Sequence, residues 1–319
     1  MRAARTLMLC ALTAAALART APGAADQIMT RVYLNGVPTP VFFNDGDSFR
    51  VLEGPLAGTT ARLAGFNTLE SFGPVHSWGG WHPYELYVNA KMATLNARWG
   101  VWHCTSDLSR DGYGRILWDC PDLAVDHLSK GLAHAMNVDD NPARAEYLWA
   151  QRAAMAQRRG MWAHGVPEFV LTSAHSADED PTRPFHYNRR VSTRFGHSES
   201  VRHHDTYLEC QMVCHDETAV DMERSDAAAG RLLQTPALNA RLAEFDTVHL
   251  SQLVWRWART HELPSWLPAD LREPVEAALQ GFEREGAFGP VTTQRGACFR
   301  YVDFRRRYGT GRAGCLDQH

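Results

Sequence analysis

DGDSFRVLEGPLAGTTARLAGFNTLE, residues 45–70, carries the pattern from which the fold of this chain is predicted. The turn signals Asp45-Gly46-Asp47 and Gly54-Pro55 divide it into short segments rich in β-branched and aromatic residues, which is typical of strands. Two similar segments, VYLNGV and PVFFN, precede it within residues 32–44. Residues 29–66 therefore predict a series of short strands joined by tight turns.

Helical and hairpin patterns follow these strands. Pro83 suits a first helical position and Gly100 ends the apolar spacing, so a helix is expected between them. Further along, the pattern predicts a hairpin and two helices, at 101–106 with 113–119, 123–134 and 141–160. This order of elements is that of an OB-type barrel. We therefore expect an α+β protein in which residues 30–166 form a five-stranded OB-type β-barrel with packed helices.

The character of the sequence changes after Pro167. Residues 173–184 (SAHSADEDPTRP) are polar and punctuated by proline, so 167–204 is predicted to be a linker. From residue 205 onward helical periodicity dominates, which predicts a mostly helical C-terminal domain of unknown function over 205–319. Its expected helices lie at 206–224, 226–246, 248–261 and 268–285.

The first 25 residues have the layout of a secretory signal peptide. Arg2 and Arg5 precede an apolar run at 7–17, and a stretch of small residues at 18–25 follows it. The run is too short for a permanent membrane span. We expect an exported protein, periplasmic or secreted, without a permanent membrane anchor; the alternative is a buried or mitochondrial-type N-terminal helix.

The composition suits a folded enzyme better than a general nucleic-acid packager. Apolar residues make up 45% of the 319 positions and charged residues 22%, so the chain can bury a core. The formal net charge is −3, which excludes a global basic field. Phosphate groups would therefore have to be bound by a few locally placed arginines.

The cysteines fit an oxidising compartment. Cys10 lies in the predicted signal peptide, and an even number of cysteines remains after it, which suggests disulfides in an exported protein. Their order favours local pairs, although other pairings are possible: Cys104–Cys120, Cys210–Cys214 and Cys298–Cys315. Zinc binding by Cys210, Cys214 and His215, with His203 and His204 nearby, is the alternative for the second pair.

Short motifs in the first half occur in a recognisable order. They are Asp45-Gly46-Asp47-Ser48, RLAGFNTLE at 62–70, Tyr113-Gly114-Arg115 and Gly160-Met161-Trp162. In this order they resemble the staphylococcal nuclease (thermonuclease) family over residues 38–164. The resemblance implies a calcium-dependent endonuclease with little sequence preference, acting on DNA, RNA or both. No family is recognised for residues 168–319.

The residue types in these motifs suit cleavage of a phosphodiester. Arg62 and Arg115 can each donate paired hydrogen bonds to phosphate oxygens. Asp47 offers a hard oxygen ligand for Ca²⁺ or a similar ion. Glu70 is the candidate general base, or the group that positions the attacking water.

The resemblance adds further roles and two departures. It implies that Asn67 and the Thr68 backbone carbonyl join Asp47 at the metal, and that Tyr113 contacts the nucleotide. Asn67 stands where the family usually has aspartate, so weaker calcium binding or another divalent ion is expected. Leu69 stands where the family usually has proline, which would fix the loop before the glutamate.

Alternatives stay open at this point. A nuclease-like barrel with impaired catalysis could serve as a nucleic-acid- or protein-binding module, or the C-terminal domain could carry the activity. Trp78 and Trp81 could stack on bases or simply pack over the barrel. A basic cluster at 305–307 could hold a nucleic-acid backbone or be a solvated loop.

Overall fold

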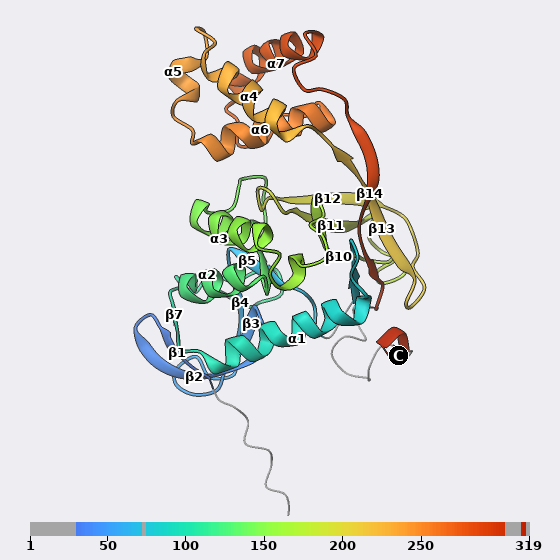
Figure 1. Ribbon diagram of the computed structural model, residues 1–319. Helices are drawn as coiled ribbons and strands as arrows, with labels where there is room; N and C mark the ends of the chain where they lie inside the picture. Colours follow the sequence, from blue (N-terminus) through green and yellow to red (C-terminus); the bar gives the residue numbers. More distant parts are fainter. Residues whose placement is uncertain (1–29, 72–74, 304–313, 317–319) are drawn as a thin grey trace, which may run out of the picture.

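The computed structural model describes residues 30–71, 75–303 and 314–316. The predicted signal peptide, residues 1–25, lies outside these ranges. The protein is a mixed α+β protein, as predicted (Figure 1). Within the described part of the chain, no helix has the length and apolar character needed to cross a bilayer.

The N-terminal half is built on a curled sheet with the strand order β7-β1-β2-β3-β4-β8. β1 to β4 form an antiparallel meander, whereas β7 and β8 add to its two edges in parallel. Alternate residues such as Val32, Phe43 and Phe49 are fully buried and form its core. The strands are β1 (Thr30–Leu34), β2 (Val37–Asp45), β3 (Ser48–Val51), β4 (Thr60–Leu63), β7 (Trp102–Cys104) and β8 (Ile116–Trp118).

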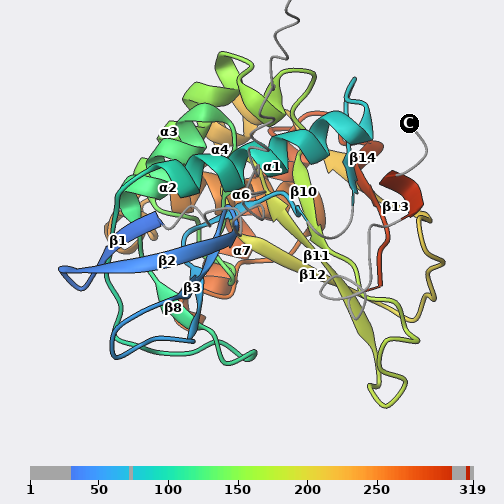
Figure 2. The same ribbon diagram turned by 90° about the horizontal axis from the view of Figure 1, so that it is seen from below.

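Helices pack along one side of this sheet (Figure 2). They are α1 (Pro83–Trp99), α2 (Pro121–Lys130) and α3 (Ala145–Ala156), with a short 3₁₀ turn, η1 (Gly160–Trp162), after α3. The helix expected between Pro83 and Gly100 is confirmed by α1, which begins at a capping box formed by His82 and Glu85. The helix expected at 141–160 begins later, since the backbone N–H of Asn141 bonds to Asp139 in a turn.

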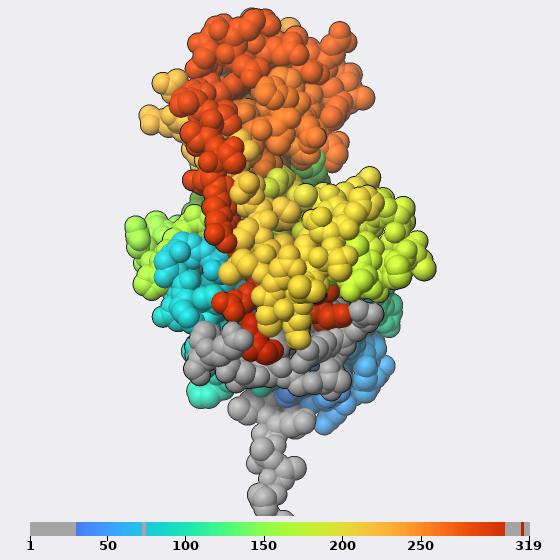
Figure 3. Space-filling view, turned by 90° about the vertical axis from the view of Figure 1, so that its right-hand side faces the viewer, coloured from blue at the N-terminus to red at the C-terminus, as the bar shows by residue number. Residues whose placement is uncertain are grey.

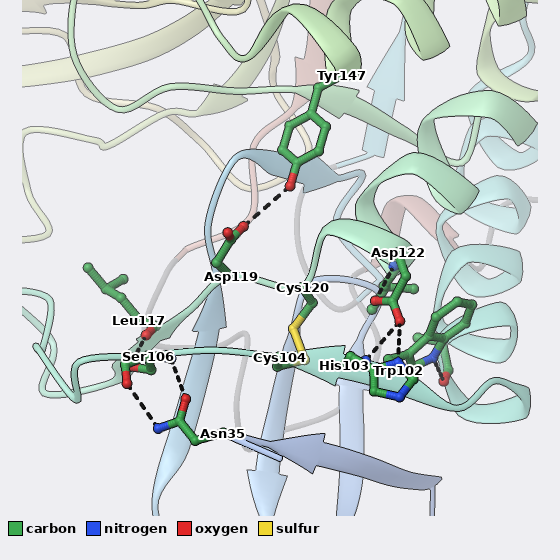
Figure 4. The surroundings of a disulfide bond; sticks show 12 residues. Asn35, Trp102, His103, Cys104, Ser106, Leu117, Asp119, Cys120, Asp122 and Tyr147 are labelled. Atoms are coloured by element: carbon green, nitrogen blue, oxygen red, sulfur yellow. Dashed lines mark hydrogen bonds and ion pairs between the residues drawn. A yellow bond between two sulfur atoms is a disulfide. The ribbon is translucent and has the colours of Figure 1, made fainter.

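The two edges of the curled sheet meet near the Cys104–Cys120 disulfide (Figure 4). Thr105 and Asp119 exchange backbone hydrogen bonds of 2.8 and 2.9 Å beside it. The predicted disulfide is thus confirmed, but the predicted hairpin is only partly right. β7 pairs with β1 and β8 with β4, so this bridge and disulfide join strands from opposite edges of the sheet.

The predicted linker at 167–204 is wrong. These residues form an antiparallel sheet of order β10-β11-β12, with β10 (Phe169–Ser173), β11 (His186–Ser192) and β12 (Ser198–His203). Phe169, Val170 and Leu171 are buried, and each packs into a different cluster, with the helical layer, with the N-terminal half and with β13 and β14. The polar, proline-containing stretch at 173–184 is the connection between β10 and β11.

The helix predicted at 206–224 is also wrong, since β13 (Met212–Ala219) occupies its centre. β13 pairs with β14 (Thr292–Arg300), which in turn pairs with β6 (Val75–Ser77) from the N-terminal half. The side chain of Glu217 on β13 is buried and accepts backbone hydrogen bonds from Glu168 and Phe169, both 3.0 Å. Non-local pairing therefore overrides the local helical spacing here.

This pairing also corrects two of the predicted disulfides. Cys210–Cys214 and Cys298–Cys315 are not formed; the bonds are Cys214–Cys298 and Cys210–Cys315. The β13–β14 register places Cys214 directly opposite Cys298, with Cα atoms 4.1 Å apart. Four residues of extended chain span roughly 13 Å, too far for a disulfide between Cys210 and Cys214.

A layer of helices forms the far end of the molecule from the curled sheet (Figures 1 and 3). It consists of α4 (Met222–Leu233), α5 (Asn239–Leu242), α6 (Thr247–Thr260) and α7 (Ala269–Arg284) around buried leucines and tryptophans. The Asp221 and Asp246 side chains cap α4 and α6. The helical character predicted for 226–285 is confirmed, with shorter elements. A 3₁₀ turn, η3 (Gly314–Leu316), is the last described element.

Candidate functional site

The Asp45-Gly46-Asp47-Ser48 motif forms the turn between β2 and β3. The Asp45 carboxylate accepts hydrogen bonds from the Ser48 hydroxyl at 2.6 Å and from the Asp47 backbone N–H at 3.3 Å. Gly46 faces β5 (Phe66–Thr68), and a Cβ there would lie 2.5 Å from the Thr68 methyl carbon. The glycine therefore lets the turn pack directly against the second motif.

Arg62 on β4 joins the two motifs. Its Nη1 donates to Asp47 Oδ1 at 2.5 Å, and its Nη2 donates to Asn67 Oδ1. The other Asp47 oxygen accepts the Thr68 backbone N–H at 2.8 Å. Asp47, Arg62, Asn67 and Thr68, which lie apart in the sequence, are thus in direct contact.

Asn67 is held in one orientation by its amide nitrogen. Nδ2 donates to the Thr68 carbonyl at 2.8 Å and lies 3.3 Å from His134 Nε2. His134 comes from β9 (Ala133–Ala135), where the β5–β9 register sets it opposite Asn67. Burial lowers the pKa of His134 to about 4, so the ring is neutral and can accept this bond. The Asn67 amide oxygen consequently faces Arg62.

Negative charge accumulates around Arg62. Burial, together with the charges of Asp47 and Glu70, raises the pKa of Asp45 to about 8. Burial alone would lower the pKa of Arg62, but Asp47, Asp45 and Glu70 raise it above its ordinary value. Glu70 is therefore close enough to act electrostatically on both groups. The site contains more carboxylates than cations, which favours binding of a further positive charge.

Glu70 follows a well-anchored segment. Leu69 is only 1% exposed and packs in a cluster with Trp78, Leu86 and Trp162. On the other side of Glu70, the carbonyl of Ser71 accepts a hydrogen bond of 2.5 Å from Lys91 on α1. Packing of the leucine thus immobilises the loop in the place of a proline.

The third motif lies at the edge of the same sheet. The Arg115 guanidinium is ion-paired with Asp111 at 2.7 Å, and its carbon lies 5.4 Å from the ring centre of Tyr113. Leu117 on β8 is the register partner of Arg62, so Arg115, two residues earlier, lies towards the same face. No direct contact joins Arg62 and Arg115 among the described residues. Tyr113 is 68% exposed and open to a ligand.

The donor set is of the kind that calcium prefers. Asp47 and Asn67 offer side-chain oxygens and Thr68 a backbone carbonyl, all hard ligands. Burial raises the pKa of Asp45, and the charges of Asp47 and Glu70 add to this; a divalent ion would offset the effect of those two charges. However, the oxygens of Asp47, Asn67 and Thr68 already accept hydrogen bonds, and the described residues contain no ready-made cluster of acidic or histidine ligands. Cation binding would have to displace Arg62 from Asp47 and Asn67, and the Asn67 amide nitrogen from the Thr68 carbonyl.

Other sequence candidates are resolved differently. Trp78 is 5% exposed and donates to the Gly165 carbonyl, and Trp81 donates to the Met161 carbonyl, so both pack over the N-terminal half. Cys210 and Cys214 are both in disulfides, which removes the zinc alternative. The basic cluster at 305–307 lies outside the described residues.

Two members of the site were missed by sequence reasoning. Asp45 was treated as part of a turn, although its pKa is the most informative in the site. His134 carried no sequence signal, because its role depends on the pairing of β5 with β9. Comparison with protein-family models, curated proteins and solved structures finds no match to this chain.

Proposed function

We propose that this protein is a metal-dependent phosphodiesterase that hydrolyses DNA, RNA or both. The observation that carries the proposal is the contact of Arg62 with Asp47 and Asn67, beside the carboxylates of Asp45 and Glu70. A guanidinium among carboxylates at the surface of a curled sheet provides phosphate recognition, cation ligands and a base within one small region. We infer that the sheet is an OB-type barrel of the staphylococcal nuclease kind.

Each residue has a defined task in this proposal. Arg62, displaced from Asp47 and Asn67 when a cation binds, donates to a phosphate oxygen, and Arg115 turns from Asp111 to a second one. Glu70 accepts a proton from the attacking water or orients it. Asp47, Asn67 and the Thr68 carbonyl would hold calcium, which supplies positive charge to the phosphate and acidifies water. The exposed Tyr113 ring contacts the nucleotide.

The disulfides support the proposal of an exported enzyme. The disulfides indicate an oxidising, extracellular environment. We propose that residues 1–25 direct export to the periplasm or the medium and are removed there. N-terminal sequencing of protein recovered outside the cytoplasm tests this, and an intact Met1 would contradict it.

A second candidate function rests on Asn67. Its uncharged amide oxygen already accepts a hydrogen bond from Arg62, which favours a barrel that binds nucleic acid or protein without cleaving it. Anchoring of Leu69 in the core argues against this, because the backbone that carries Glu70 is held firmly. The two candidates predict different rates of phosphodiester cleavage, but both allow nucleic acid to bind.

The deciding experiment uses the oxidised chain without residues 1–25. Cleavage of plasmid DNA and of RNA is measured with Ca²⁺, Mg²⁺, Mn²⁺ or chelator, for wild type, Arg62→Ala and Glu70→Gln. We expect each variant to lose about 10²–10³ in rate. Arg31→Ala and Glu53→Gln change exposed residues of β1 and of the loop after β3, and should leave the rate unchanged.

The outcomes separate the candidates. Metal-dependent cleavage that both site variants lose supports the phosphodiesterase. Equal inertness of all proteins with every ion refutes it. Retained oligonucleotide binding by fluorescence anisotropy, in that inert case, would support the binding module instead.

A further inference from the structure

A cavity of about 300 Å³, partly open to solvent, lies between α3, the turn that joins β11 to β12, and the helices α4 and α6. Its polar lining comes from α3, the turn between β11 and β12, α4 and the start of α6: Arg152, Arg194, Asp226, Thr247 and Ser251. This volume suits a small organic ligand. The cavity is separate from the Arg62 site and shares no residue with it.

Two guanidinium groups with unused donors face this cavity. Arg194 Nη2 donates to Asp226 Oδ2 at 2.7 Å, and its Nε is buried, so the donors that can reach a ligand are those of the Nη atoms. Arg152 makes a single long contact, 3.4 Å, to the Arg194 carbonyl. Burial and the charge of Arg194 lower the pKa of Arg152. An anion between the two groups would relieve this repulsion and use their free donors.

The start of α6 adds neutral donors and a favourable dipole. Thr247 and Ser251 are one helical turn apart on the same face of the helix. Neither hydroxyl has a hydrogen-bond partner among the residues that the structure describes. The N-terminal end of a helix of this length attracts anions, although the capping carboxylate of Asp246 offsets part of that field.

The charges define the ligand. Arg152 and Arg194 against Asp226 leave one net positive charge at the wall, before the helix end is counted. Paired guanidinium donors surrounded by hydroxyls match the several oxygens of a phosphate better than the two of a carboxylate. Phe195 and Val248 supply an apolar wall for the organic part of a ligand.

We propose that this cavity binds a small phosphate monoester, with the phosphate between Arg152, Arg194 and the first turn of α6. Asp226 holds Arg194 in place and limits the positive charge, so it also weakens the affinity for the anion. Arg152 and Asp226 therefore act in opposite directions on the same equilibrium.

Calorimetry tests the proposal on the oxidised chain without residues 1–25, in chelator. The probes are inorganic phosphate, adenosine 5′-monophosphate and adenosine. Both phosphates should bind and adenosine should not. Arg152→Gln should weaken binding at least about tenfold, which is the loss expected for one charge-assisted hydrogen bond. Asp226→Asn should strengthen binding, and Arg158→Gln, an exposed arginine just after α3, should have no effect.

Several results would overturn the proposal. They are absence of phosphate binding at millimolar concentration, equal binding of adenosine, or shifts of the same sign in the Arg152 and Asp226 variants. Loss of phosphate binding in Arg62→Ala, with Arg152→Gln unaffected, would assign the phosphate to the other site. If Arg152→Gln does not fold, the Thr247→Val, Ser251→Ala double variant replaces it, and unchanged binding by that variant would equally refute the proposal. An inactive Glu70→Gln protein that still binds phosphate keeps this proposal distinct from the proposed hydrolysis.

Discussion

Replacement of Asp45 by asparagine should stabilise the folded protein at alkaline pH. Burial and the negative charges of Asp47 and Glu70 raise the pKa of Asp45 from 3.8 to about 8. Asparagine has the shape of the protonated carboxyl and keeps an oxygen for the Ser48 hydroxyl, which donates at 2.6 Å. The substitution therefore removes the ionisation and preserves the local geometry.

The sign follows from where the proton is held. Below pH 3.8 the carboxyl is protonated in both states and contributes nothing. Between 3.8 and about 8 the unfolded chain releases the proton while the folded protein keeps it, so stability falls as the pH rises. A shift of this size sets an upper limit of about 6 kcal/mol, and relaxation around a charged carboxylate should leave about 3 kcal/mol.

The measurement is urea unfolding of wild type and Asp45→Asn at pH 4, 7 and 9, with disulfides intact and no metal. The variant should match wild type at pH 4 and exceed it by about 3 kcal/mol at pH 9. Glu53→Gln, an exposed carboxylate in the loop after β3, should give a curve parallel to wild type. If Asp45→Asn is also parallel to wild type from pH 4 to 9, the described electrostatics of the site are wrong.

Three other predictions address the same half of the molecule. Cys104→Ala with Cys120→Ala opens a loop of 16 residues and should cost about 3 kcal/mol in urea unfolding; a loss below about 1 kcal/mol would show that the sheet edges stay joined without the bond. Gly131→Ala should cost about 2 kcal/mol, because φ is +67° and a Cβ would lie 2.3 Å from the Arg159 carbonyl oxygen; Gly112→Ala, with open space around it, is the control, and equal urea midpoints would contradict the prediction. Asn67→Asp should tighten calcium binding about tenfold in calorimetry, because it adds a charged ligand; weaker binding would exclude Asn67 from the cation site.

The contact of the first two motifs was predictable because it depends on neighbouring elements. β2, β3 and β4 form a meander, so Asp47 and Arg62 come together through successive antiparallel pairings. The Asn67–His134 contact required the pairing of β5 with β9, separated by 67 positions, and nothing in the local sequence indicates it. The local sequence was thus sufficient to predict that the motifs meet, but not to identify the residues that orient their side chains.

The C-terminal half shows the same limit more strongly. Apolar spacing correctly indicated helical character over 226–285, including α6, although α4 begins within the segment predicted as an earlier helix. β13 was missed because its strand character comes from β14, which follows it only after the whole helical layer. Two of the predicted disulfide pairings were wrong for the same reason, because Cys214 is bonded to Cys298 across the β13–β14 ladder.

The pairing of β14 with β6 has a consequence for how the protein is made. Val75–Ser77 are synthesised well before their partner strand, around Cys298–Arg300. Val75–Ser77 therefore stay without this strand neighbour until Cys298–Arg300 have been synthesised. Contacts of such long sequence separation form slowly. We therefore expect the segment after Glu70 to reach its final position late in folding.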